Sequence, residues 1–160
     1  MSDAGMSKIV RTIASISFPF VLIYGFYIIA HGHLTPGGGF QGGAVVASGC
    51  AMLLIAFGSS WVLTKMKEHH LSLLEHAGAL GFIGLAFLGL FIGGAFFTNF
   101  LFDAPGLFGV VPALGSTSAN INTGGVLPLM NFAVGLKVIA GLFSIILVMA
   151  YASSHKEGIE

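Results

Sequence analysis

The sequence predicts an all-α integral membrane protein with four transmembrane helices. Of its 160 residues, 56% are hydrophobic and only 8% are charged, and the mean hydropathy is +0.97. A soluble domain would carry about 25% charged residues. The apolar residues gather in four segments, 13–30, 43–64, 71–97 and 126–151. Each segment has about 18 or more residues, enough at about 1.5 Å per residue to cross a hydrocarbon core of about 30 Å.

Helices are expected in all four segments, because lipid tolerates only a backbone whose hydrogen bonds are satisfied internally. The segments also lack the alternating pattern of a barrel strand. The first segment contains Pro19, which favours a kink. At this length the chain is expected to form one membrane domain over residues 1–160.

The basic residues predict the orientation of the helices. Lys8 and Arg11 precede the first segment, Lys65 and Lys67 lie between the second and third, and Lys156 follows the fourth. The other two connections contain no Lys or Arg. By the positive-inside rule, both termini are expected in the cytoplasm and the protein in the cytoplasmic membrane.

Composition excludes several functional classes. The net charge is zero and no basic patch is present, which argues against a nucleic-acid partner. Cys50 is the single cysteine, so the chain has no intrachain disulfide. His31 and His33 are expected on the outer side and the other four histidines on the inner side, so they cannot complete one zinc site. Neither a metal nor another cofactor is therefore expected.

The connection between the first two segments is rich in glycine and proline. Residues 31–43 are expected to form an irregular outer hairpin, because Gly and Pro disfavour both helix and strand. The hairpin residues of interest are Pro36, Gly37, Gly38, Gly39, Gln41, Gly42 and Gly43. Gly37, Gly39 and Gly42 match the spacing of a dinucleotide-binding fingerprint, but no strand precedes them and no acidic residue follows at the required distance.

Small residues at four-residue spacing predict close helix packing instead. Gly39 and Gly43 lead such a stripe into the second helix, and Gly89 and Gly93 repeat the pattern in the third. Gln41 is expected to supply an uncharged hydrogen-bonding group near the outer mouth.

Lys137 lies near the middle of the fourth segment. Its side chain reaches about 6 Å, while each interface is about 15 Å away, so it cannot snorkel fully to water. An ionisable residue at this depth favours membership of a proton relay or ion path; the alternative is a fixed ion pair or carbonyl contact. Asp103 is expected on the outer side and Glu75 on the inner side, so a carboxylate partner is expected from another polypeptide.

Glu75 and His76 begin the third segment and are candidates for access from the inside, the alternative being charge compensation at a helix N-terminus. His31 and His33 are candidates for the outer mouth, since His titrates near neutral pH. The alternative there is ordinary interfacial hydrogen bonding.

The segment Pro36-Gly-Gly-Gly-Phe-Gln-Gly-Gly43, preceded by Gly32-His33, resembles the MnhB-domain family. This family comprises the B-type small subunit of Mrp multisubunit sodium/proton antiporters and of related membrane-bound hydrogenase and sulfane reductase complexes. The segment from Pro128 to Lys137 extends the resemblance. The resemblance implies a subunit without a redox centre, packed against other subunits of an Mrp-type complex that transports Na⁺ and H⁺.

The sequence therefore predicts a small membrane subunit of an Mrp-type cation/proton antiporter module that helps to form the ion path. The module is expected in a stand-alone antiporter or in a ferredoxin-linked oxidoreductase complex. At His31 and Gln41 the chain departs from the antiporter version of the family, and these two departures favour the oxidoreductase-linked complex. The alternative is a purely structural subunit that packs and seals larger antiporter-like subunits. Neither prediction makes this chain an enzyme by itself.

Overall fold

The computed structural model describes residues 5–34, 36–65, 68–101 and 124–156, and these form helices without any strand. The elements are α1 (Lys8–His31), α2 (Gly38–Phe57), α3 (Ser59–Lys65), α4 (Glu68–Gly93) and α6 (Leu127–Lys156). Four of them, all except the short α3, are long and apolar enough to span a membrane. The predicted all-α fold with four candidate spans is confirmed.

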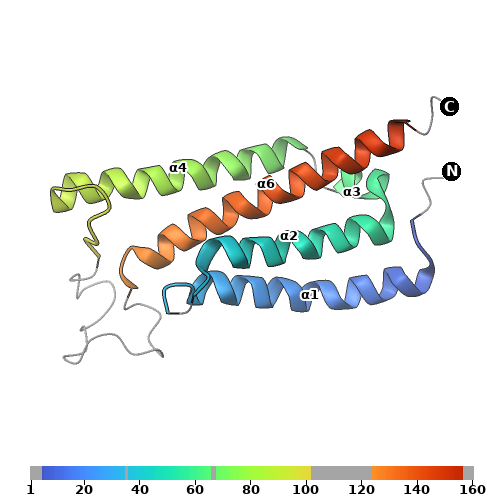
Figure 1. The fold of residues 1–160 in the computed structure, drawn as a ribbon, viewed down its shortest axis with the longest axis horizontal. Helices are drawn as coiled ribbons and strands as arrows, with labels where there is room; N and C mark the ends of the chain where they lie inside the picture. The colour runs from blue at the N-terminus through green and yellow to red at the C-terminus, as the bar shows by residue number, and fades with distance from the viewer. Residues whose placement is uncertain (1–4, 35, 66–67, 102–123, 157–160) are drawn as a thin grey trace.

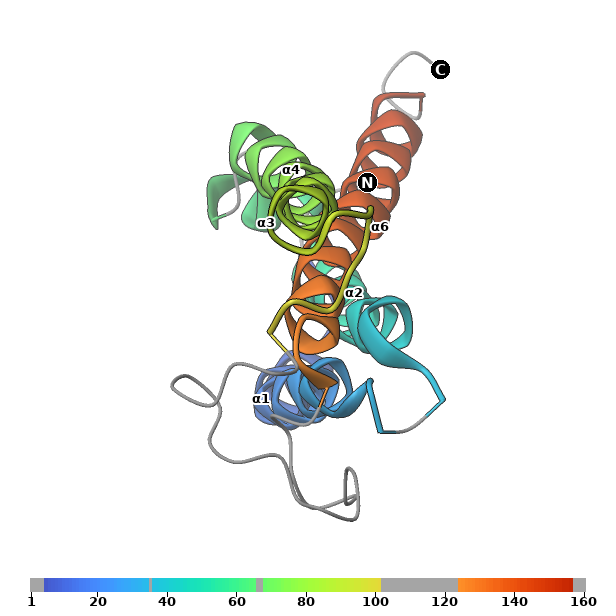
Figure 2. The same cartoon turned by 90° about the vertical axis from the view of Figure 1, so that its left-hand side faces the viewer.

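The four long helices lie side by side, and the beginning of α1 and the end of α6 lie at the same end of the molecule (Figure 1). We call this the terminal end, and the opposite end, where α1 connects to α2, the hairpin end. Seen along the helices, α1 and α4 occupy opposite edges and α6 lies between them (Figure 2). α2 packs against α1 and α6, and α4 packs against α6. α1 and α4 are therefore the outer spans, each 17% buried against 44% for α2.

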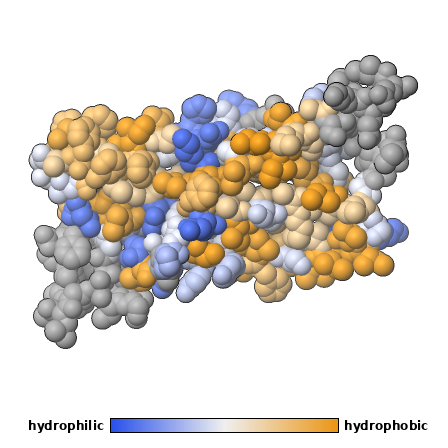
Figure 3. Space-filling view, viewed as in Figure 1, coloured by the Kyte–Doolittle hydropathy of each residue, from blue (hydrophilic) through white to orange (hydrophobic). Residues whose placement is uncertain are grey.

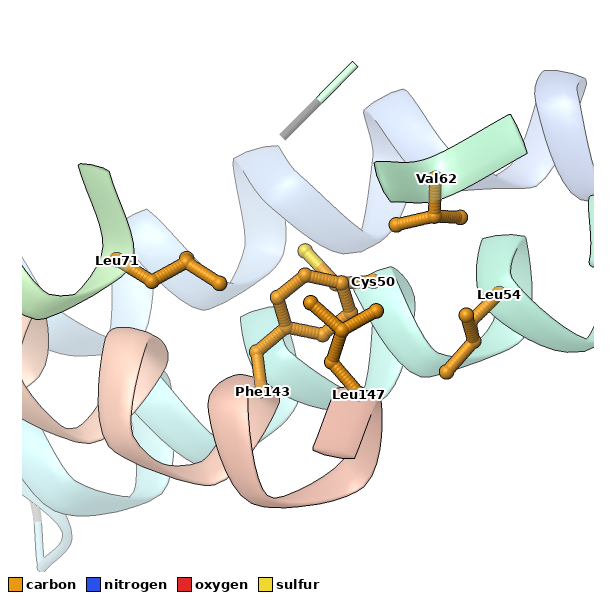
Figure 4. Close-up of a cluster of buried hydrophobic side chains, with 6 residues drawn as sticks. All are labelled: Cys50, Leu54, Val62, Leu71, Phe143 and Leu147. Atoms are coloured by element: carbon orange, nitrogen blue, oxygen red, sulfur yellow. The ribbon is translucent and has the colours of Figure 1, made fainter. Parts of the chain in front are cut away.

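A compact apolar cluster joins the helices toward the terminal end (Figure 4). It brings together side chains from α2, α3, α4 and α6, none more than 8% exposed: Cys50, Leu54, Val62, Leu71, Phe143 and Leu147. Because lipid is as apolar as these side chains, close packing rather than exclusion of water holds the cluster together. The cluster anchors the first turn of α4 against α6.

The glycine-rich connection is shorter than the sequence suggests, because α2 begins at Gly38 rather than at Gly43. Tertiary packing overrides the low helix propensity of these glycines. A Cβ on Gly42 would lie 2.7 Å from the carbonyl oxygen of Gly25 in α1, and one on Gly39 would overlap the carbonyl oxygen of Asn131 in α6. The glycines therefore let α2 approach both neighbours closely. The predicted contact stripe at Gly39 and Gly43 faces α6.

Two other boundaries also differ from the expected ones. The second apolar segment is divided at Gly58, whose φ of 88° separates α2 from α3. The third ends at Gly93, and the chain then folds back, so that Gly89 and Gly93 meet Thr98. The expectation that these two glycines pack against another helix is wrong, because the space they leave is filled by the chain reversal. The outer connection with Asp103 lies outside the described residues.

Candidate functional site

The hairpin end holds both histidines that the sequence places at the outer mouth. His31 closes α1, and its ring stacks on Tyr27 with 5.0 Å between centroids. His33 is half-buried against the start of α6, where a Cβ on Gly124 would lie 2.9 Å from its ring. Both ring nitrogens of His33 are buried and lack a hydrogen-bond partner. A buried polar atom without a partner costs free energy, so this imidazole would gain from a polar ligand.

The turn between α1 and α2 depends on two glycines with positive φ. Gly37 has φ 151° and Gly38 has φ 68°, conformations that L side chains rarely adopt. The Gln41 side chain folds back over Gly37, and the Asn131 side chain of α6 lies against Gly38. Pro36 is exposed. The hairpin residues therefore fix a backbone path and leave a polar rim of two amide side chains.

Lys137 lies in α6 on the side that faces α4. A Cβ on Gly78 of α4 would lie 2.8 Å from the Lys137 backbone nitrogen, so the two helices almost touch there. Lys137 is about 15 Å from Leu127, where α6 begins, at about 1.5 Å per residue. Its side chain is nevertheless exposed on the chain taken alone. Lys137 thus lies at the open edge of the α4–α6 seam, near the middle of the candidate span Leu127–Ala152.

Glu75 lies on the same seam, closer to the terminal end. It is half-buried, and its carboxylate oxygen would lie 3.7 Å from a Cβ on Gly141. Gly141 is one helical turn from Lys137, about 6 Å along α6. The structure therefore brings Glu75 nearer to Lys137 than sequence order alone suggests. On the face of the molecule seen in Figure 3, hydrophilic groups over α4 and over α6 interrupt the apolar surface near its middle.

No ion pair joins Lys137 to a carboxylate of the described residues, and the geometry of antiparallel helices explains why. The Cα–Cβ bonds of a helix tilt toward its N-terminus. α4 and α6 run in opposite directions (Figure 1), so the Cα–Cβ bond of Lys137 tilts toward the hairpin end and that of Glu75 toward the terminal end. The two side chains therefore start in opposite directions along the seam.

A half-open pocket of about 190 Å³ surrounds Glu75 between α4 and α6. Its wall includes two hydroxyl groups, Ser72 of α4 and Ser144 of α6. His76 is exposed beside it, with Nδ1 2.5 Å from the carbonyl oxygen of Ser72. A carbonyl oxygen only accepts, so Nδ1 carries the proton.

Sequence reasoning missed Ser72, which lies three residues before Glu75 and hence on the same helix face. The described residues contain no group of three or more His, Cys, Asp or Glu side chains that could hold a metal ion.

Comparison with known proteins places this arrangement in a family. Residues 9–144 match the family described as a domain related to the MnhB subunit of the Na⁺/H⁺ antiporter. The chain belongs to this family. The resemblance found at the glycine-rich segment is thereby confirmed, and the chain is a multi-pass membrane protein of an ion-transport family.

Two relatives illustrate the similarity. An uncharacterised protein of Methanocaldococcus jannaschii is 40% identical over 144 residues, which is 86% of this chain and 51% of the relative. A Staphylococcus aureus protein, whose name proposes an antiporter subunit, mnhB2, is 30% identical over 92 residues, or 58% of this chain and 64% of the relative. The matched regions thus span about half to two thirds of these relatives.

Proposed function

We propose that this chain is a small membrane subunit of an Mrp-type cation/proton antiporter module and that its α4–α6 seam forms one wall of the ion path. The observation that carries the proposal is the exposure of Lys137 near the middle of the candidate span Leu127–Ala152. Leaving an ammonium in lipid is costly. A neighbouring subunit with a carboxylate or a wet cavity against this seam would remove that cost.

Access to the path is proposed from both ends. Glu75 and His76 lie toward the terminal end, which the positive-inside rule assigns to the cytoplasm. His31 and His33 lie at the hairpin end, where the buried ring nitrogens of His33 have no hydrogen-bond partner and can bind a polar ligand. No ion pair joins Lys137 to Glu75 in the described residues, and we assign each of them to a different half of the path. Na⁺ and H⁺ are the ions that we propose to move along it.

A purely structural subunit is the competing function. Large apolar side chains are exposed along α1, such as Phe20 (69%) and Ile23 (69%), and along α4, such as Leu80 (69%) and Phe91 (80%). These faces suit contact with lipid or with larger antiporter-like subunits, whether in a stand-alone antiporter or in an oxidoreductase-linked complex. On this reading, Lys137 only ties one subunit to another.

Replacing Lys137 by Met in the assembled complex separates the two functions. We expect cation-dependent proton flux in inverted membrane vesicles to fall at least about tenfold, the effect of about 1.4 kcal/mol on a barrier, while the complex still assembles. Lys65→Met, at the exposed end of α3, is the control for loss of a lysine and should transport normally. Normal flux with the Lys137 variant would refute the ion-path proposal. Loss of the complex itself would favour the structural function.

A further inference from the structure

We propose that Glu75, Ser72 and Ser144 form a binding site for a monovalent alkali-metal cation between α4 and α6. The inference deepens the proposed function, on which it rests, because it names the ligand class at one place on the path. The starting point is the pocket around Glu75, whose lining combines one carboxylate, two hydroxyls and three apolar side chains: Leu71, Ser72, Glu75, Ser144, Leu147 and Val148.

The oxygen atoms of this pocket suit a hard cation. Alkali and alkaline-earth ions prefer carboxylate, hydroxyl and carbonyl oxygens over nitrogen or sulfur. The Ser144 hydroxyl donates to the carbonyl oxygen of Gly141 at 2.9 Å, which leaves its lone pairs free to face a cation. The Ser72 hydroxyl lies 3.4 Å from His76 Nδ1, whose proton goes to the Ser72 carbonyl. The hydroxyl oxygen has two lone pairs, so one can still face the pocket.

The charge of the pocket points to a monovalent ion. Glu75 is the single carboxylate among the lining residues, and no cationic side chain is among them. One carboxylate balances one positive charge in a low-dielectric setting, whereas a divalent ion would leave an uncompensated charge there.

Size and access also fit a partly hydrated cation. The pocket of about 190 Å³ has room for about six waters at about 30 Å³ each. Glu75 lies about 9 Å along α4 from His69, where this span begins. An ion can therefore arrive from the terminal end with part of its hydration shell and exchange waters for the protein oxygens.

Thermal unfolding of the full chain in detergent tests the site directly. A ligand that binds only the folded state raises the unfolding midpoint with concentration. We expect NaCl to raise the midpoint by several degrees over choline chloride at equal ionic strength, with LiCl and KCl measured in parallel to rank the ions. Glu75→Gln should abolish the shift, and Ser144→Ala should weaken apparent affinity by about tenfold, as loss of a supporting ligand does.

Matched controls separate the site from general salt effects. Glu68→Gln removes the same charge at the first residue of α4, and Ser48→Ala removes a hydroxyl from α2 that is bonded to Ala44; both should retain the shift. Circular dichroism confirms that each variant is helical. ²³Na line broadening on the native chain, reversed by lithium, gives a second readout that requires no variant.

Three outcomes would overturn the inference: an equal shift with choline, a shift retained in Glu75→Gln, or a midpoint that responds to pH but not to any alkali cation. Failure here is distinguishable from failure of the proposed function. If no cation shift is seen while Lys137→Met still stops transport, the cation site is wrong and the ion path stands. If the cation shift is present and Lys137→Met transports normally, the cation site stands and the ion path is wrong.

Discussion

The contact between Gly78 and α6 offers the sharpest test of the seam on which Lys137 and Glu75 lie. In Gly78→Ala, the new Cβ would lie 2.6 Å from the carbonyl oxygen of Ala133 and 2.8 Å from the backbone nitrogen of Lys137. Both atoms are backbone, so no rotamer change relieves the overlap. Restoring an ordinary separation of about 3.4 Å requires α4 and α6 to part by about 0.8 Å or to bend.

The expected cost follows from two opposing terms. Overpacking of a close contact costs about 1–3 kcal/mol, and replacing Gly by Ala within a helix returns about 0.5–1 kcal/mol. Gly78→Ala should therefore destabilise the chain by about 0.5–2 kcal/mol, or lower the unfolding midpoint by a few degrees. Gly84 has no atom within 4 Å of its Cβ position on the same helix, so Gly84→Ala should be stabilising by about 0.5–1 kcal/mol.

Thermal denaturation followed by circular dichroism in detergent measures both changes on one scale. Gly81→Ala, whose Cβ would meet Ala133 at an ordinary 3.6 Å, is a second control and should resemble Gly84→Ala. Equal midpoints for Gly78→Ala and Gly84→Ala would refute the packing argument. Transport by the assembled complex should fall only in Gly78→Ala, because only this variant moves α4 relative to Lys137.

Two further predictions concern topology and the beginning of α6. In a Cys50→Ala background, a cysteine at the exposed Pro36 should be labelled by a membrane-impermeant thiol reagent from outside intact cells, and one at the exposed Ser60 only after permeabilisation; the reverse pattern would overturn the orientation. Asn99 accepts from the Val126 nitrogen at 2.8 Å and donates to the Gly124 carbonyl at 3.0 Å. Asn99→Ala should therefore cost about 1–3 kcal/mol and speed hydrogen exchange at Val126, whereas unchanged exchange would mean that these bonds do not hold the start of α6.

The sequence by itself determined the number of candidate spans and their helical nature, and it predicts that Lys137 lies near the middle of the fourth. In lipid, only helices and closed barrels satisfy all backbone hydrogen bonds. The lengths of the apolar segments and the positions of the charged residues are therefore enough to predict the spans. The glycine-rich segment also identified the family, which the comparison confirms. The positive-inside rule predicts that both termini are cytoplasmic, and this orientation stays a prediction.

Tertiary structure decided which faces meet. Local propensity disfavours helix at Gly39 and Gly42, yet both are helical, because their missing Cβ atoms let α2 pack against α6 and α1. Only the antiparallel pairing of α4 with α6 brings Glu75 to Gly141, one turn from Lys137, and adds Ser144 to its pocket. Such contacts depend on helices far apart in sequence, and packing sets the rotation of each helix about its axis. In a uniformly apolar segment, the local sequence does not predict that rotation.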